Sequence, residues 1–121
     1  MYIASDYPYT YSDLEKITAI FNKPYNTDRI RTTTLCKTLA GNPCPLYIIT
    51  NFSSTKEEIA KRNAIILTAR VHPGEVNGSF VIEGVVKYLI GNTSEAYRLR
   101  ESYVIKVLFI KVEPLNRLFQ C

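Results

Sequence analysis

The sequence of 121 residues contains no long apolar run. Its longest apolar stretches, 81–90 and 104–110, are interrupted by charged residues and fall well short of the roughly 20 residues that span a bilayer. The first residues have neither the basic segment nor the apolar segment of a secretory signal. We therefore expect a protein without membrane segments that resides in the cytoplasm.

The sequence also lacks paired cysteines of the kind that bind metal or form disulfides. Its three cysteines, Cys36, Cys44 and Cys121, form no C-x-x-C pair, and an odd number without a secretory signal favours reduced thiols. We interpret Cys36 and Cys44 as packing residues. With a single histidine, His72, the chain has no ligand set for a zinc finger.

Charge of one sign is not concentrated anywhere in the chain. Fifteen Lys and Arg residues against eleven Asp and Glu residues give a net charge of +4, and acids are interspersed among the positive residues. No RNA-recognition or helix-turn-helix signature is present. The surface is therefore expected to be mildly basic and solvated, with no nucleic-acid partner.

The opening segment predicts a short amphipathic helix. Ser12 or Asp13 can cap it, with Glu15 in the third position after Ser12, as in a capping box. Apolar residues then recur at helical spacing, at Leu14, Ile17, Ile20 and Phe21. Pro24 ends the helix, because a proline inside a helix removes a hydrogen bond and clashes with the preceding turn.

The rest of the chain alternates strand and helix patterns. Residues 29–39 and 46–52 are rich in β-branched and apolar residues on either side of a turn, which predicts a hairpin. The nearly continuous apolar run 64–71 is typical of a central strand covered on both faces. Helices at 79–90 and 95–100 and a last strand at 103–112 complete a βαβ unit. We expect one α/β domain, 1–121, with a mixed β-sheet flanked by helices.

One turn carries most of the chemistry. His72-Pro73-Gly74-Glu75 follows the 64–71 strand, and Pro-Gly is a strong turn dipeptide that lets His72 and Glu75 point toward each other. The carboxyl ends of strands are where open α/β sheets gather their sites. An imidazole and a carboxylate suit zinc, although a catalytic zinc usually takes three protein ligands. An ordinary exposed turn with polar flanks remains the alternative.

The segment around this turn resembles a known family. Residues 68–75, Thr-Ala-Arg-Val-His-Pro-Gly-Glu, with Asn77, Ser79 and Phe80, are similar to the first zinc-binding segment of the M14 metallocarboxypeptidases. The likeness is strongest to the cytosolic carboxypeptidase branch. Residues 7–12 resemble that branch's entry into the catalytic domain, and residues 35–50 resemble its next block.

The resemblance implies a zinc carboxypeptidase fold and a function in proteolysis. His72 and Glu75 match the family's first two zinc ligands, so zinc is the implied cofactor, while Arg70 lies in the similar block without an assigned role. Members of this branch remove glutamates from the carboxyl termini of proteins such as tubulin. The resemblance therefore implies acidic protein tails as partners and the cytosol as location.

The sequence departs from the family pattern toward its end. The Asn-Pro-Asp-Gly core that follows the last strand in the family is absent after Val107. So are the third zinc ligand, the glutamate that serves as general base and the arginines that bind substrate. We expect an incomplete domain with an exposed apolar sheet edge and little peptidase activity by itself. The alternative is a catalytically inactive remnant or interaction module that binds no metal.

Overall fold

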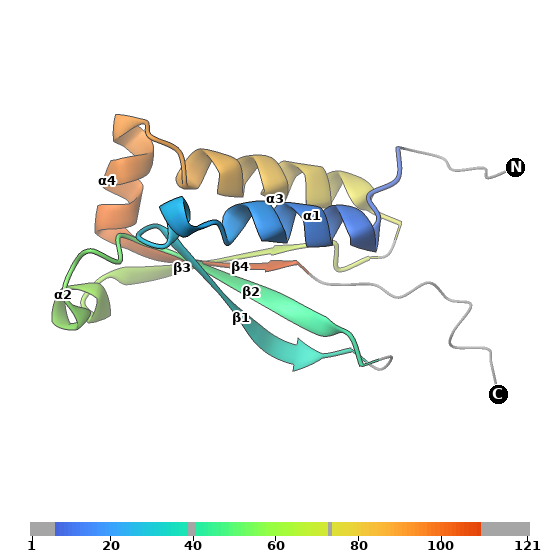
Figure 1. The fold of residues 1–121 in the computed structure, drawn as a ribbon, viewed down its shortest axis with the longest axis horizontal. Coiled ribbons are helices and arrows are strands. Elements are labelled where there is room, and N and C mark those ends of the chain that lie inside the picture. Colours follow the sequence, from blue (N-terminus) through green and yellow to red (C-terminus); the bar gives the residue numbers. More distant parts are fainter. Residues whose placement is uncertain (1–6, 39–40, 73, 110–121) are drawn as a thin grey trace, which may run out of the picture.

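A four-stranded mixed sheet forms the body of the computed structural model, which describes residues 7–38, 41–72 and 74–109 (Figure 1). The elements in chain order are α1 (Tyr11–Phe21), η1 (Pro24–Asn26), β1 (Ile30–Lys37), β2 (Pro43–Ile49), α2 (Lys56–Ala60), β3 (Asn63–Ala69), α3 (Val76–Leu89), α4 (Ser94–Ser102) and β4 (Tyr103–Phe109). The predicted α/β class with a mixed sheet and flanking helices is confirmed.

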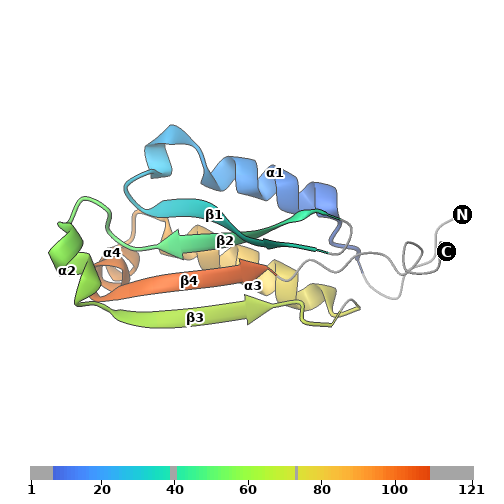
Figure 2. The same cartoon turned by 90° about the horizontal axis from the view of Figure 1, so that it is seen from below.

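The strand order is β1-β2-β4-β3. The predicted hairpin is present, since β1 pairs with β2 antiparallel, and β2 pairs with β4 in the same sense. The predicted βαβ unit is also confirmed, because β3 and β4 run parallel and are joined through α3 and α4. Figure 2 shows these two strands pointing the same way, with α3 beginning beyond the carboxyl end of β3.

The prediction of a central strand at 64–71 is wrong. β3 lies at one edge of the described sheet, and its side chains are buried on one face only. Ile65 and Leu67 pack against the core, whereas Ile66 on the opposite face is 69% exposed. A continuous apolar run shows that both faces of a strand can be buried. It does not show how many other strands and helices of the chain cover those faces.

The uncovered face of the sheet is largely apolar. Figure 1 shows α1 and α3 side by side on one face, and none of the described helices lies against the other. The strand registers place ten side chains on this open face, alternating with the core positions, of which six are apolar: Arg31, Thr33, Leu46, Ile48, Ala64, Ile66, Thr68, Val104, Lys106 and Leu108. The sequence predicted an exposed apolar edge, and in the described residues the exposed apolar surface is this face of the sheet, which includes Ile66 of the edge strand β3. No helix in the described residues is long and apolar enough to cross a membrane.

The core lies between the covered face of the sheet and the two long helices. Tyr47 of β2 is fully buried at its centre, where its ring meets Phe21 of α1 and Phe109 of β4 edge-on, with centroids 5.6 Å and 5.7 Å apart. Leu14 and Ile17 add to it as predicted, whereas Ile20 is exposed. These contacts fix α1 and the hairpin on the same sheet that carries β3.

The start of α1 differs from the prediction. Thr10, not Ser12 or Asp13, is the N-cap, and its hydroxyl accepts a hydrogen bond from the Asp13 backbone N–H at 3.2 Å. The Asp13 carboxylate accepts from the Thr10 N–H at 2.9 Å, so the capping box uses Asp13 instead of Glu15. The hydrogen bonds from the Thr10 side chain and backbone lower the pKa of Asp13 below its usual range.

Several element bounds also shift. β2 begins at Pro43 rather than 46, and α3 begins at Val76 rather than 79, directly after the turn. A short helix, α2, occupies a polar stretch in which we had expected no element. Cys44 is buried as predicted, but Cys36 is exposed, so its interpretation as a packing residue is wrong. The last part of the predicted strand 103–112 lies outside the described residues.

Candidate metal site

The structure places His72 and Glu75 in the connection between β3 and α3. The Glu75 backbone N–H donates to the His72 carbonyl at 3.1 Å, so the chain folds back on itself between the two residues. A second bond, from the Val76 N–H to the Gly74 carbonyl at 3.0 Å, leads into α3, whose N-cap is Glu75. Pro73 lies outside the described residues. The two residues singled out in the sequence therefore share one turn.

Both side chains are available to an incoming ligand. His72 and Glu75 are exposed, and within the described part of the chain neither side chain makes a hydrogen bond or ion pair. An imidazole nitrogen and a carboxylate oxygen are donors that zinc accepts. The donor chemistry therefore fits two positions of a zinc site. The described residues contain no group of three His, Cys, Asp or Glu side chains that could hold a metal ion.

Arg70, two residues before His72, has an unusual backbone. Its φ is 59°, in the left-handed region that residues with a side chain rarely adopt. Its guanidinium donates to the carbonyl of Tyr9 at 2.5 Å, across 61 positions of sequence. Neither feature could be predicted from the sequence, because nothing in the residue type marks an arginine for positive φ.

The opposite end of α3 is held by two arginines. Arg100 of α4 is only 4% exposed, and its guanidinium donates to the carbonyl of Leu89 and, at 3.1 Å, to that of Gly91. Arg29 donates to the intervening carbonyl of Ile90 at 2.8 Å. The last carbonyls of a helix have no partners within the helix and carry partial negative charge, so two guanidinium groups stabilise this end.

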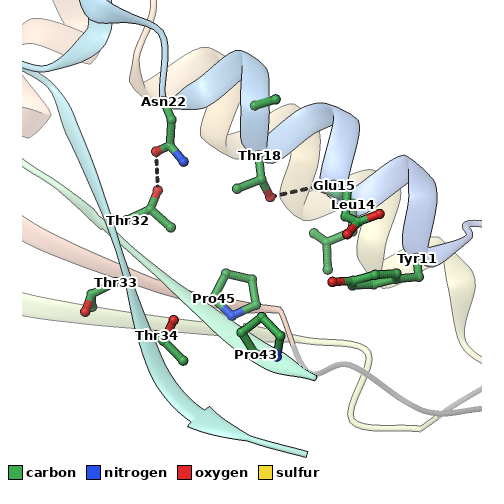
Figure 3. Close-up of a pocket in the computed structure, with 11 residues that line it drawn as sticks. Tyr11, Leu14, Glu15, Thr18, Asn22, Thr32, Thr33, Thr34, Pro43 and Pro45 are labelled. Atoms are coloured by element: carbon green, nitrogen blue, oxygen red, sulfur yellow. Dashed lines mark hydrogen bonds between the residues drawn. The ribbon is translucent and has the colours of Figure 1, made fainter. Parts of the chain in front are cut away.

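A separate groove of about 330 Å³ lies between α1 and the hairpin of β1 and β2 (Figure 3). Across it, the Thr32 hydroxyl donates to the side-chain oxygen of Asn22 at 2.5 Å. Hydroxyl, amide, carboxylate and apolar groups line it, from Tyr11, Leu14, Glu15, Thr18, Ala19, Asn22, Thr32, Thr33, Thr34, Pro43 and Pro45. None of these residues belongs to the turn, so the groove and the candidate metal site are distinct features.

Comparison with known families gives a clear result. Residues 17–111 match the sequence model of the zinc carboxypeptidases, peptidase family M14. This chain belongs to that family. The matched segment includes the whole β3–α3 turn, and it covers well over half of the chain.

Individual relatives support the same assignment. The chain is 44% identical over 108 residues to cytosolic carboxypeptidase 2 of Homo sapiens, and 44% identical over 114 residues to cytosolic carboxypeptidase 1 of Mus musculus. Each alignment covers 88% of this chain. The chain nevertheless spans only 12% and 9% of the length of these two relatives.

Solved structures show the same fold. A putative carboxypeptidase A from Shewanella denitrificans superposes with a TM-score of 0.68 at 25% identity, covering 84% of this chain and 25% of the other. A metallo-carboxypeptidase from Burkholderia cenocepacia gives a TM-score of 0.66 at 23% identity, covering 84% and 26%. The described elements therefore correspond to about a quarter of a metallocarboxypeptidase chain.

Proposed function

We propose that this chain supplies two zinc ligands, His72 and Glu75, to a metallocarboxypeptidase domain that removes residues from the carboxyl termini of proteins. One observation carries the proposal. In a chain of the zinc carboxypeptidase family, the turn after a parallel strand carries a histidine and a glutamate whose backbones are hydrogen-bonded to each other, and both side chains are exposed without a hydrogen bond or ion pair among the described residues. That combination leaves both donors ready for a metal.

The division of chemical roles follows from the donor set. Zinc, when bound, polarises the scissile carbonyl and lowers the pKa of its water toward neutrality. His72 and Glu75 would hold the metal through an imidazole nitrogen and a carboxylate oxygen. A third ligand is required from residues other than those described, since no third donor joins the pair among them. The resemblance to the family likewise assigns the general base to a glutamate that this sequence lacks. The isolated chain is accordingly expected to have little or no peptidase activity.

The proposed substrates are acidic carboxyl-terminal tails, such as the glutamates of tubulin. The support is the similarity to proteins named cytosolic carboxypeptidases, together with the resemblance of residues 68–75 to that branch. The same names support a cytoplasmic location. We propose no nucleic-acid or membrane partner, because the positive residues are dispersed among acids.

A chimaera tests this function. Residues 17–109 replace the corresponding segment of human cytosolic carboxypeptidase 2, and release of glutamate from a glutamate-ended peptide is measured. We expect the chimaera to be active and its His72→Ala variant to lose activity by about 10–100-fold or more, because even partners that merely orient a ligand cost that much. Lys56→Ala, a change at an exposed position of α2, serves as the matched control.

Two outcomes of the chimaera experiment separate function from folding. Thermal unfolding of each variant is measured beside activity, so that an inactive but misfolded chimaera is recognised. A folded chimaera that works equally well with alanine at position 72 contradicts the proposed role of the histidine. An equal loss of activity in Lys56→Ala also contradicts the specific role of His72, because the Lys56 side chain is remote from the turn in sequence and faces solvent.

A second candidate function is supported by the open face of the sheet. Its exposed apolar residues, above all Ile66, favour a non-catalytic interaction module whose partner covers this face. The two candidates differ in one outcome. A module of this kind binds no zinc, and its His72→Ala variant behaves as the unchanged protein.

A further inference from the structure

We propose that Arg70 is the positioning residue of the candidate metal turn. Its left-handed backbone turns the chain out of β3, and its guanidinium ties that point to the start of α1. The proposal rests on the proposed function, because it concerns how His72 and Glu75 are held for a metal. It assigns a role to a residue that the sequence left without one.

The backbone gives the first argument. Arg70 is the one non-glycine residue with positive φ in the described ranges. A side chain makes this conformation unfavourable, whereas glycine adopts it freely. Conformations of this kind persist where surrounding contacts over-determine them, and they gather at functional sites. An arginine at this position therefore implies that its side chain contributes something that glycine does not.

The side chain provides that contribution. Its contact, the Tyr9 carbonyl, belongs to a well-fixed part of the molecule: Tyr9 is 4% exposed and its ring lies edge-on to Phe80 at 5.0 Å. The next residue, Thr10, caps α1. A hydrogen bond from a guanidinium is charge-assisted and stronger than one between neutral groups. It joins the end of β3 to the start of α1.

The first turn of α3 also packs close to the backbone of Arg70. A Cβ built on Gly78 would lie 3.4 Å from the Arg70 backbone nitrogen, so the helix passes close to this residue. His72 and Glu75 have no side-chain bonds of their own among the described residues. Their positions are thus set by the backbone that Arg70 and α3 hold between them.

The single histidine makes a direct experiment possible. The imidazole carbon-bound protons of His72 give one set of NMR signals, which report Zn²⁺ added to the 121-residue chain. Arg70→Gly keeps the left-handed backbone but removes the tether, and Arg70→Lys keeps one charged donor. We expect Zn²⁺ affinity to fall about tenfold in Arg70→Gly, the scale of effect found for groups that orient ligands, and to be largely rescued in Arg70→Lys.

Two further readouts distinguish positioning from general stability. The amide protons of Glu75 and Val76 close the turn, and we expect their exchange with solvent to rise about tenfold in Arg70→Gly. The amide exchange of Tyr47 and Val107, which pair with each other in the β2–β4 ladder, is expected to stay unchanged. The unfolding equilibrium of Arg70→Gly stays close to that of the unchanged protein, because the relieved backbone offsets the lost hydrogen bond. Arg70→Ala, which keeps the unfavourable φ, unfolds more readily.

The outcomes are separable from those of the proposed function. Unchanged Zn²⁺ affinity and unchanged exchange at Glu75 and Val76 in Arg70→Gly overturn the role of Arg70 while leaving the zinc site in place. An imidazole in the unchanged protein that does not respond to Zn²⁺ overturns the metal site instead. Amide exchange then still decides whether Arg70 holds the turn.

Discussion

Replacing Tyr47 with alanine is expected to lower the free energy of unfolding by about 3–5 kcal/mol. The side chain is fully buried between α1 and β4, and its removal leaves a cavity lined by Phe21 and Phe109. Single domains are stable by only about 5–15 kcal/mol, so this loss is a large fraction of the total free energy of unfolding. Urea unfolding followed by circular dichroism measures the loss.

Tyr47→Phe is the matched control for this prediction. It keeps the ring and loses only the hydrogen bond between the Tyr47 hydroxyl and Thr18, which is worth about 1 kcal/mol. Burial raises the pKa of Tyr47 to about 12 in the folded protein, so its share of the stability is complete below pH 10 and is lost as the pH rises toward 12. Tyr47→Phe lacks this alkaline loss. Equal destabilisation by alanine and phenylalanine would contradict the central packing role of the ring.

Arg100→Ala is expected to destabilise the fold by about 2–4 kcal/mol, because it leaves buried carbonyls without donors. The Arg100 guanidinium donates hydrogen bonds to two carbonyls at the end of α3, those of Leu89 and Gly91. Its loss also removes a positive charge from the negative end of the helix dipole. Thermal and urea unfolding measure the change in stability, and amide exchange in the last turn of α3 locates it.

Two other arginines serve as controls for Arg100. Arg98 lies two positions earlier on α4 and is exposed, so Arg98→Ala is expected to change stability by no more than about 0.5 kcal/mol. Arg29, which is partly exposed and donates to Ile90, is expected to give an intermediate effect of about 1 kcal/mol. If Arg100→Ala were no worse than Arg98→Ala, the arginine would not hold α3.

Periodicity and turn chemistry predicted most of the fold. The alternating residues in 29–39 and the turn before residue 46 predicted the hairpin, and the helix between two apolar runs predicted the parallel pair of β3 and β4. The turn with His72 and Glu75 was placed correctly at the end of β3, because Pro-Gly cannot continue a strand. These features depend on residues near one another in sequence.

The sequence-based predictions fail mainly at features that depend on contacts between residues distant in the chain. Ser12 with Glu15 fits the capping-box pattern, in which Ser or Thr is followed three residues later by Glu or Gln, whereas the structure forms the box with Thr10 and Asp13. A continuous apolar run at β3 does not reveal which faces the rest of the chain covers. Arg100 lies in a polar segment and is typical of a surface residue, yet the end of α3 buries it. Arg70 was missed because backbone strain has no sequence pattern.

Zinc affinity of the purified chain, measured by competition with a chromogenic chelator, tests the metal site most directly. The unchanged protein is compared with His72→Ala and Glu75→Ala, and with Glu57→Ala on exposed α2 as control. We expect weak binding of one zinc ion, as two protein ligands allow, that falls about tenfold or more in each site variant and is unaffected in Glu57→Ala. Zinc binding that is unchanged by either site substitution, or absent from the folded protein, would contradict the assignment of His72 and Glu75 as ligands in this chain.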